Sequence, residues 1–206
     1  MKKILIAIPS GNTLDVDFVK SLLALQPVGS VDIKIEEGSL VYVAREKLAM
    51  YAIEEEFDYV LWLDSDMTFK PDLLKRLMMN DKPVCAGLYF TRRPPYQPAY
   101  WHKIRMGTVE ERETVRMVDV PKDELVEIDA CGFAAVLTKV DVLSDVYNRY
   151  STMFSPFVGY GEDISFCIRA KNCGYSIWMD SKIPVGHKGM TIITQESYEA
   201  FRRKGG

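Results

Sequence analysis

Apolar residues along this chain are spaced in a way that predicts alternating strands and helices. Strands are predicted where apolar residues run continuously or alternate with polar ones, at residues 2–9, 31–37, 58–63 and 82–90. Helices are predicted between them, where apolar residues recur at helical spacing, at residues 13–25, 43–56 and 71–80. The run DYVLWL at 58–63 has the unbroken apolar character of a central parallel strand covered on both faces. This order is typical of an α/β fold in which a mostly parallel central sheet is flanked by helices.

Residues 91–128 differ from this pattern. They begin with TRRPPYQPAYW, rich in arginine, proline and aromatics, and continue with charges alternating with valine and methionine, as in short exposed strands or a hairpin. Two interpretations stay open, a solvated surface insertion or a loop that shapes a substrate cleft. A core pattern returns in DACGFAAVL, and residues 190–206 are expected to form a C-terminal tail or short polar helix. Since no linker or repeat is visible, residues 1–206 are expected to form a single domain.

The composition narrows the class of protein. The 206 residues are 48% hydrophobic and 27% charged with a net charge of −3, which suits one globular domain and gives no overall basicity for nucleic acid. No apolar run approaches the ~20 residues of a transmembrane helix, and the N-terminal run ILIAI is too short for a signal peptide. The four cysteines contain no CxxC pair and are expected to be core thiols. We therefore expect a cytoplasmic protein, either free or peripheral to a membrane.

Two carboxylates follow the central apolar run in YVLWLDSDMTF, residues 59–69. Ligands of open α/β sheets collect at the carboxyl ends of the strands, where Asp64 and Asp66 are predicted to lie. Residues i and i+2 on an extended backbone share one face, about 6–7 Å apart, so these two charges need a compensating cation. Carboxylate oxygens suit Mg²⁺ or Mn²⁺. The alternative is an exposed turn whose aspartates cap the helix that follows Pro71.

Two further motifs carry candidate functional residues. In GYGEDISFCIRAKNCGY, residues 159–175, Glu162 and Asp163 open a predicted helix, a position that the helix dipole alone would also favour. In VGHKG, residues 185–189, His187 lies between two glycines in a predicted loop that follows a strand. A lone histidine is more often structural than a metal ligand, but this one does not lie on an apolar face.

Taken in order, these motifs resemble the GT-A fold of nucleotide-sugar glycosyltransferases, most closely the small bacterial and phage enzymes related to glycosyltransferase family 2. The resemblance spans roughly residues 4–189 and rests on AIPSGN, VAREKLA, YVLWLDSDMTF, DACGFAAVL, GEDISFCIRAKNCGY and VGHKG. It implies a metal-dependent enzyme that moves a sugar from a nucleoside diphosphate-sugar, by family habit UDP or GDP, to an acceptor hydroxyl. The acceptor stays open between a glycan, a lipid-linked glycan and a protein. The stereochemistry also stays open, with inversion favoured.

The resemblance also implies roles for individual residues. Donor binding is implied for Pro9, Ser10, Arg45, Asp64, Ser65 and Asp66, and acceptor binding for Gly132 and Glu162. Asp66 and His187 would hold Mn²⁺ or Mg²⁺, with Asp64 on the ribose or in the metal shell. Asp163 would be the general base of an inverting reaction. Glu46 replaces the asparagine usual in the family, and because an acid is unfavourable near a diphosphate, Glu46 is expected to point away.

General chemistry agrees with these roles. A departing nucleoside diphosphate gains negative charge that a divalent cation neutralises, and an imidazole ligand shifts the preference towards Mn²⁺. The attacking hydroxyl loses a proton, which a carboxylate opposite the leaving group accepts. In one alternative, residues 64–68 match the DxDxT of haloacid-dehalogenase-type phosphatases, although that motif normally follows the first strand. In another, the chain is a nucleotide-sugar-binding module without catalytic activity.

The stretch TRRPPYQPAYW gives a last hypothesis. Its candidate side chains are Arg92, Arg93, Tyr96, Tyr100 and Trp101. They could form a mobile wall over the donor or acceptor, because aromatic faces stack on sugars and bases and arginines pair with phosphates. The equally favoured alternative is that Tyr100 and Trp101 anchor the loop to the core.

Overall fold

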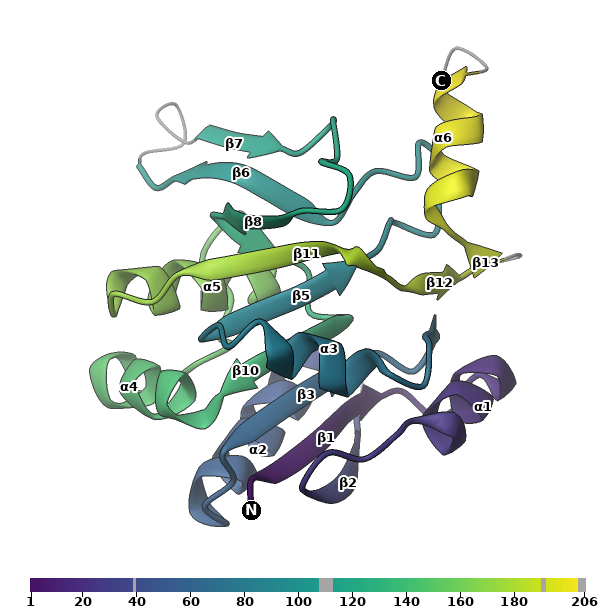
Figure 1. The fold of residues 1–206 in the computed structure, drawn as a ribbon. Helices are drawn as coiled ribbons and strands as arrows, with labels where there is room; N and C mark the ends of the chain where they lie inside the picture. The colour runs from purple at the N-terminus through teal and green to yellow at the C-terminus, as the bar shows by residue number, and fades with distance from the viewer. Residues whose placement is uncertain (39, 108–112, 190–191, 204–206) are drawn as a thin grey trace.

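The computed structural model describes the chain except residues 39, 108–112, 190–191 and 204–206. A seven-stranded sheet forms its centre, in the order β2-β1-β3-β10-β5-β11-β8 (Figure 1). Its strands are β1 (Lys3–Ser10), β2 (Ser30–Glu37), β3 (Tyr59–Leu63), β5 (Val84–Leu88), β8 (Leu125–Ile128), β10 (Ala135–Lys139) and β11 (Ile177–Pro184). Within this described sheet β10 and β8 run against the other five strands, so the sheet is mostly parallel, as predicted.

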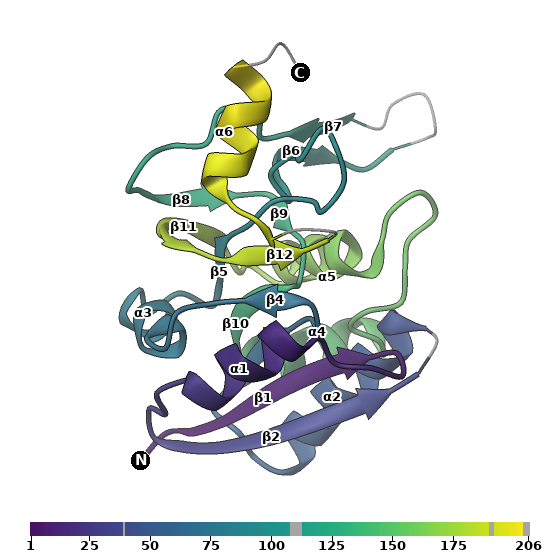
Figure 2. The ribbon, with the colours of Figure 1, turned by 90° about the vertical axis from the view of Figure 1, so that its right-hand side faces the viewer.

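Helices cover both faces of this sheet, which explains the unbroken apolar character of β1, β3 and β5. The helices are α1 (Val16–Ala24), α2 (Val41–Glu54), α3 (Leu73–Met79), α4 (Val140–Tyr150), α5 (Glu162–Asn172) and α6 (Gln195–Arg203). Figures 1 and 2 show α1 and α3 on one face and α2, α4 and α5 on the other. None of the described helices has the length and apolar character that crossing a membrane requires.

Two three-stranded sheets adjoin the central sheet, the first at the carboxyl edge beyond β3 and the second next to β8. They are β13-β12-β4 and β7-β6-β9. Their strands are β4 (Met67–Thr68), β6 (Tyr100–Arg105), β7 (Glu113–Arg116), β9 (Ala130–Cys131), β12 (Gly186–Lys188) and β13 (Ile192–Ile193). Residues 91–128 therefore contain the expected hairpin, β6 and β7, but their last four residues are the edge strand β8 of the central sheet. In the C-terminal segment the described residues include the helix α6.

An aromatic cluster holds α5 against the centre of the sheet. Trp62 on β3 packs against Phe133 and Phe154, with ring centroids 6.0 and 5.2 Å apart. Phe166 on α5 stacks on Phe154 at 4.8 Å and meets Phe133 edge-on at 5.0 Å. Truncating a buried aromatic of this kind typically costs about 3–5 kcal/mol. The cluster thus fixes the start of α5 beside the end of β3.

The predicted core thiols are confirmed for three of the four free cysteines, Cys85, Cys131 and Cys167, which are buried.

Candidate functional site

Two aspartates lie in the turn that follows β3, at the carboxyl edge of the sheet. Asp64 continues from β3, and its backbone N–H donates to the carbonyl oxygen of Ala134 at 3.1 Å. Ser65 and Asp66 form a turn, and β4 begins at Met67. The expectation that both carboxylates share one face assumed an extended backbone. The turn makes that assumption wrong, although both residues line the same cavity, and their carboxylates have different partners.

Asp64 is held by a buried arginine from the helix behind the sheet. Arg45 on α2 is 2% exposed, and its Nη2 donates to Asp64 Oδ1 at 2.8 Å. Its Nη1 donates to the carbonyl oxygen of Phe133 at 2.9 Å, and its Nε lies 3.4 Å from Glu162 Oε1. Burial raises the pKa of Asp64, and the positive charge of Arg45 opposes that rise. One guanidinium therefore positions the end of β3, the segment before β10 and the start of α5.

Asp66 faces two side chains from distant parts of the chain. His187 Nε2 lies 3.4 Å from Asp66 Oδ2. Figure 2 shows β12 beside β4, and the pairing of these strands places His187 opposite Met67. The backbone N–H of Lys188 donates to the carbonyl oxygen of Asp66 at 2.8 Å. Arg92 Nη1 donates to Asp66 Oδ2 at 2.6 Å. His187 therefore lies on a short strand and not in the expected loop, and strand pairing brings residues 66 and 187 together.

The imidazole of His187 is held by the backbone of Phe90 with its Nε2 towards Asp66. Its Nδ1 lies 2.9 Å from the carbonyl oxygen of Phe90, which only accepts, so Nδ1 carries the hydrogen. In the neutral ring Nε2 is then an acceptor facing the acceptor oxygen of Asp66, and such a pair needs a cation. A proton is one such cation. Burial, the largest single effect, lowers the pKa of His187, but the hydrogen bond and charge of Asp66, the Phe90 carbonyl and the charge of Asp64 together outweigh it, and the pKa is raised.

A divalent ion is a second cation that fits between Asp66 and His187. Adjacent ligands of an octahedral ion with bonds of ~2.1 Å lie about 3 Å apart, close to the 3.4 Å between Oδ2 and Nε2. A carboxylate oxygen and an imidazole whose other nitrogen is held by a carbonyl are an ordinary donor set for Mn²⁺. The described residues contain no cluster of three or more His, Cys, Asp or Glu side chains able to hold a metal. An ion here would therefore take its other ligands from substrate and water.

Glu162 and Asp163 face the same region from the start of α5. The Oδ1 atom of Asp163 accepts from the backbone N–H of Ile164 at 2.8 Å, which orients the side chain. Burial, followed by the neighbouring charge of Glu162, raises the pKa of Asp163 from 3.8 to about 6. At pH 7 about nine tenths of this carboxyl group is still ionised. Asp163 is therefore a carboxylate with an increased affinity for a proton, as a general base requires.

Two cavities meet at Asp64 and Arg92. The first, of about 360 Å³, lies between the end of β1 and the turn after β3. The second, of about 370 Å³, lies between that turn, α5 and residues 89–101. The predicted site residues lining the first are Pro9, Ser10, Asp64, Ser65 and Asp66. Those lining the second are Arg45, Asp64, Gly132, Glu162, Asp163 and His187. Every residue named for the site from sequence thus lines one of two adjoining cavities.

Tyr89 and Arg116 line the second cavity and were not among the predicted site residues. Tyr89 follows β5, and its ring packs edge-on to His187 with centroids 6.0 Å apart. A Cβ on Gly132 would lie 2.0 Å from the Tyr89 hydroxyl, so the tyrosine requires glycine there. Arg116 on β7 lies over the Trp101 ring at 4.6 Å, and burial lowers its pKa. The rule that ligands collect at strand ends could have found Tyr89, whereas no sequence signal separates Arg116 from neighbouring charges.

The stretch TRRPPYQPAYW combines both roles considered for it. Tyr100 is fully buried, and its hydroxyl accepts from a backbone N–H at 2.9 Å, so this residue anchors the loop. Arg92, Arg93 and Trp101 line the second cavity. Tyr96 lines a third, larger cavity of about 1020 Å³ beyond Arg92. Trp101 is buried like Tyr100 but lines a cavity, so it fits both of the roles considered for it.

Glu46 points away from both cavities, as expected. Its Oε2 accepts from the backbone N–H of Phe154 at 2.7 Å, and its Oε1 from that of Met153 at 2.9 Å. The hydroxyl of Thr152 donates to the same carboxylate at 3.3 Å. The acid next to Arg45 thus stabilises the loop after α4 and leaves the site.

No protein-family profile matches this chain, and no curated protein matches its sequence. Among solved structures, A197 from STIV is similar with a TM-score of 0.61 and 18% identity, over 92% of this chain and 86% of A197. GalNAc-T7, solved with UDP, GalNAc and Mn²⁺, is similar with a TM-score of 0.60 and 11% identity, over 98% of this chain and 47% of GalNAc-T7. This chain has the GT-A fold. At these identities the similarity shows the fold alone, and the chain spans about half the length of GalNAc-T7.

Proposed function

We propose that this protein is a metal-dependent glycosyltransferase that moves a sugar from a nucleoside diphosphate-sugar to an acceptor hydroxyl with inversion. The observation that carries the proposal is the meeting of Asp66 and His187. Their facing atoms are 3.4 Å apart although the residues come from distant parts of the chain, and the His187 ring is fixed so that Nε2 is available as a ligand. UDP and Mn²⁺ in GalNAc-T7, a protein of the same fold, support the same kind of donor here.

The first cavity, beside Pro9 and Ser10, suits the nucleoside, and the Asp66–His187 pair lies where a diphosphate would follow it. A divalent ion held by these two side chains would neutralise the charge of the leaving diphosphate. Arg45 holds Asp64 in place for the ribose and is itself too buried to move freely. Arg92 adds a positive charge at the junction of the two cavities.

The second cavity suits the sugar and the acceptor. Asp163 lines it together with Glu162 and Gly132, on the side of the cavity formed by α5. A carboxylate whose pKa is raised to about 6 accepts the proton of an attacking hydroxyl more readily than an ordinary aspartate. In this proposal Asp163 is the general base, and Glu162 and Gly132 bound the acceptor.

The phosphatase alternative has no support in the geometry. Its nucleophile would be Asp64, whose Oδ1 is occupied by Arg45 and which follows the third strand along the chain. A binding module without turnover would keep the same cavities, so only an activity measurement separates it from the transferase.

A ligand panel followed by two variants tests the proposal. Thermal shift with UDP and GDP, each with and without Mn²⁺, is expected to show stabilisation by one nucleotide that depends on the ion, because a ligand that binds only the folded state stabilises it. Release of UDP or GDP from nucleotide-sugars then reports turnover. Asp66→Ala and His187→Ala are expected to fold normally, to lose the ion-dependent shift and to lose most turnover.

Exposed residues of the same type serve as controls. His102→Ala and Asp81→Ala change an exposed histidine and an exposed aspartate and are expected to keep the ion-dependent shift and the turnover of the wild type. If no nucleoside diphosphate stabilises the protein and no nucleotide-sugar is turned over, the proposed function is wrong. If His187→Ala keeps the wild-type ion-dependent affinity, the metal assignment of His187 is wrong.

A further inference from the structure

The strand β2 leaves one border of the central sheet open. It pairs with β1 on one side and is the last strand of the order in the part of the chain that the structure describes (Figures 1 and 2). Its two isoleucines, Ile33 and Ile35, are 54% and 44% exposed. No proline interrupts the strand, and its register with β1 is regular over all eight residues. A regular, apolar edge strand is a surface on which another strand can pair.

The outer backbone groups of β2 belong to its odd-numbered residues. Ser30 N–H donates to Lys2 O at 2.9 Å, and Gly38 N–H donates to Ser10 O at 3.0 Å, so even-numbered residues point their backbone groups at β1. Along a strand these groups alternate between the two sides. Val31, Ile33 and Ile35 therefore direct N–H and C=O outward, away from the sheet.

The side chains of β2 separate by charge. Lys34 Nζ lies 4.0 Å from the centre of the Tyr51 ring, and Glu36 pairs with Lys47 at 2.6 Å, so the charged even-numbered side chains face α2. Side chains alternate between faces along a strand, which puts the apolar odd-numbered ones on the opposite face. From Val31 to Ile35 the strand thus has one apolar face, which ends at Glu37. On the other face Asp32, Lys34 and Glu36 alternate in sign.

We propose that β2 pairs antiparallel with β2 of a second copy of this chain, about a two-fold axis at Ile33. In this register Ile33 lies opposite Ile33 and Val31 opposite Ile35, so apolar residues meet on one face. On the other face Asp32 lies opposite Lys34, and by symmetry Lys34 lies opposite Asp32. Each of the three odd-numbered positions forms a pair that exchanges two backbone hydrogen bonds.

Charge complementarity and apolar matching together select this register among those that the backbone allows. Centring the pairing on Lys34 would set Lys34 against Lys34 and Asp32 against Glu36. Centring it on Asp32 would set Asp32 against Asp32. Centring it on Ile35 would pair Lys34 with Glu36 but would set the apolar Ile33 against the charged Glu37, so the apolar face excludes that register. Like charges directly opposite one another are destabilising, whereas opposite charges stabilise the pair. Registers centred between two residues would place outward backbone groups opposite inward ones and form no ladder. A surface complementary to itself about a two-fold axis is the kind that closes a dimer.

Sedimentation velocity and light scattering over a range of protein concentrations test this proposal. The wild type is expected to show a species of twice the 23.5 kDa chain mass. Asp32→Lys and Lys34→Asp each create two like-charged pairs and are expected to raise the dimer dissociation constant about tenfold or more. The double variant Asp32→Lys/Lys34→Asp restores opposite charges and is expected to return to within about threefold of the wild type.

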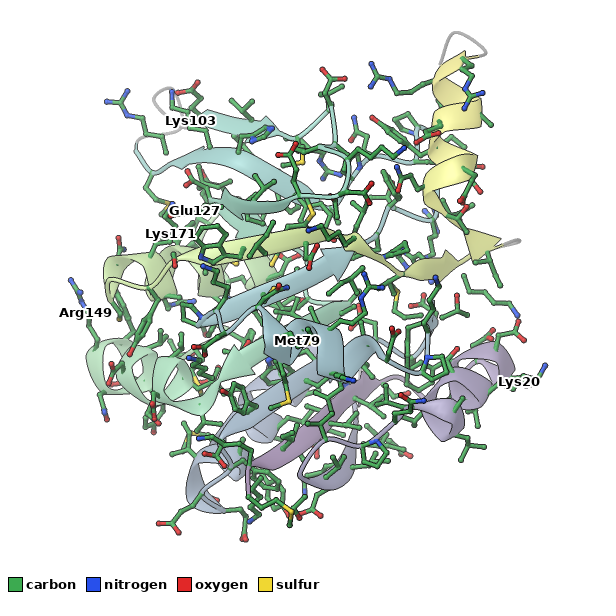
Figure 3. All side chains as sticks on the ribbon, in the orientation of Figure 1. Lys20, Met79, Lys103, Glu127, Arg149 and Lys171 are labelled. Atoms are coloured by element: carbon green, nitrogen blue, oxygen red, sulfur yellow. The ribbon has the colours of Figure 1, made fainter. Side chains whose placement is uncertain are left out.

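Ile33→Lys places two ammonium groups on the axis and is expected to give a monomer. Met79→Lys is its matched control, because Met79 is 74% exposed on α3, away from β2 (Figure 3). Circular dichroism and thermal denaturation of each variant separate loss of pairing from loss of folding. A wild type that is monomeric at every concentration, or a dimer that Ile33→Lys leaves intact, overturns the proposal. A double variant as weak as the single variants overturns the proposed register. None of these results depends on the proposed transferase activity.

Discussion

Replacing Asp163 with asparagine is expected to stabilise the protein at neutral pH. The pKa of Asp163 is raised from 3.8 to about 6 by burial and by Glu162. A pKa that is higher in the folded than in the unfolded state means that folding favours the protonated form. The stabilisation from that proton is fully present below pH 3.8 and is lost as the pH rises through about 6. The difference between the two values corresponds to up to about 3 kcal/mol.

Asparagine is the closest neutral substitute for Asp163. Its side-chain oxygen still accepts from the Ile164 N–H, a bond of 2.8 Å in the wild type, so the start of α5 is retained. Asp163→Asn is therefore expected to raise the free energy of unfolding by up to about 3 kcal/mol at about pH 8 and by little at about pH 4. Urea denaturation followed by circular dichroism at both pH values measures it, with the midpoint shifting at constant slope. In the proposed function the same variant loses turnover but keeps nucleotide binding.

Asp81→Asn is the control for this measurement. Hydrogen bonding to Lys139 lowers the pKa of Asp81, so the linkage has the opposite sign and no gain in stability is expected at about pH 8. The reasoning is refuted if Asp163→Asn is no more stable than the wild type at about pH 8. It is also refuted if the gain is equally large at about pH 4, because a gain independent of pH would have a cause other than the ionised carboxylate.

Three other substitutions have expected outcomes. Arg45→Met leaves the Asp64 carboxylate and a backbone carbonyl without their donor. Urea denaturation is therefore expected to show a free energy of unfolding that is lower by about 2–4 kcal/mol. An unchanged free energy of unfolding would contradict the role of Arg45. Arg92→Ala frees Asp66 from its ion pair. The dissociation constant of Mn²⁺, measured by calorimetry without nucleotide, is therefore expected to fall up to about fivefold. A higher dissociation constant would show that Arg92 does not compete with the ion. Glu46→Gln loses charge-assisted bonds to the loop after α4 and is expected to cost about 1–2 kcal/mol in thermal denaturation with unchanged nucleotide binding.

The parallel half of the sheet could be predicted from sequence because burial on both faces leaves a visible trace. The run YVLWL is apolar throughout, and four of its five residues are buried in β3. Strand direction leaves no such trace. The segment AVLTK looks the same whichever way it runs, and it forms β10, antiparallel to both neighbours. The edge strand β8 was taken as part of an insertion because its residues LVEI alternate with charges like the hairpin before them.

For the site, too, some residues could be predicted from sequence and their contacts could not. Asp64, Asp66 and His187 could be named from strand ends and from the ordered motifs, and the structure brings Asp66 and His187 together. Their contacts could not be named, because these depend on the turn at residues 65–66 and on the pairing of β4 with β12. Arg92 was considered only as part of a wall, although it pairs directly with Asp66. A contact between residues 26 positions apart in a loop has no periodic signature.

The pairing of β12 with β4 has a consequence for how the protein is made. A chain leaves the ribosome from its N-terminus, so β3 and the aspartates after it emerge long before His187. Contacts between residues so distant in sequence form late, after the loop between them has closed. A nascent chain that ends before β12 would therefore lack the imidazole that faces Asp66. Under the proposed function, it is expected to acquire ion-dependent nucleotide affinity only once residues 186–188 have been synthesised and have paired with residues 67–68.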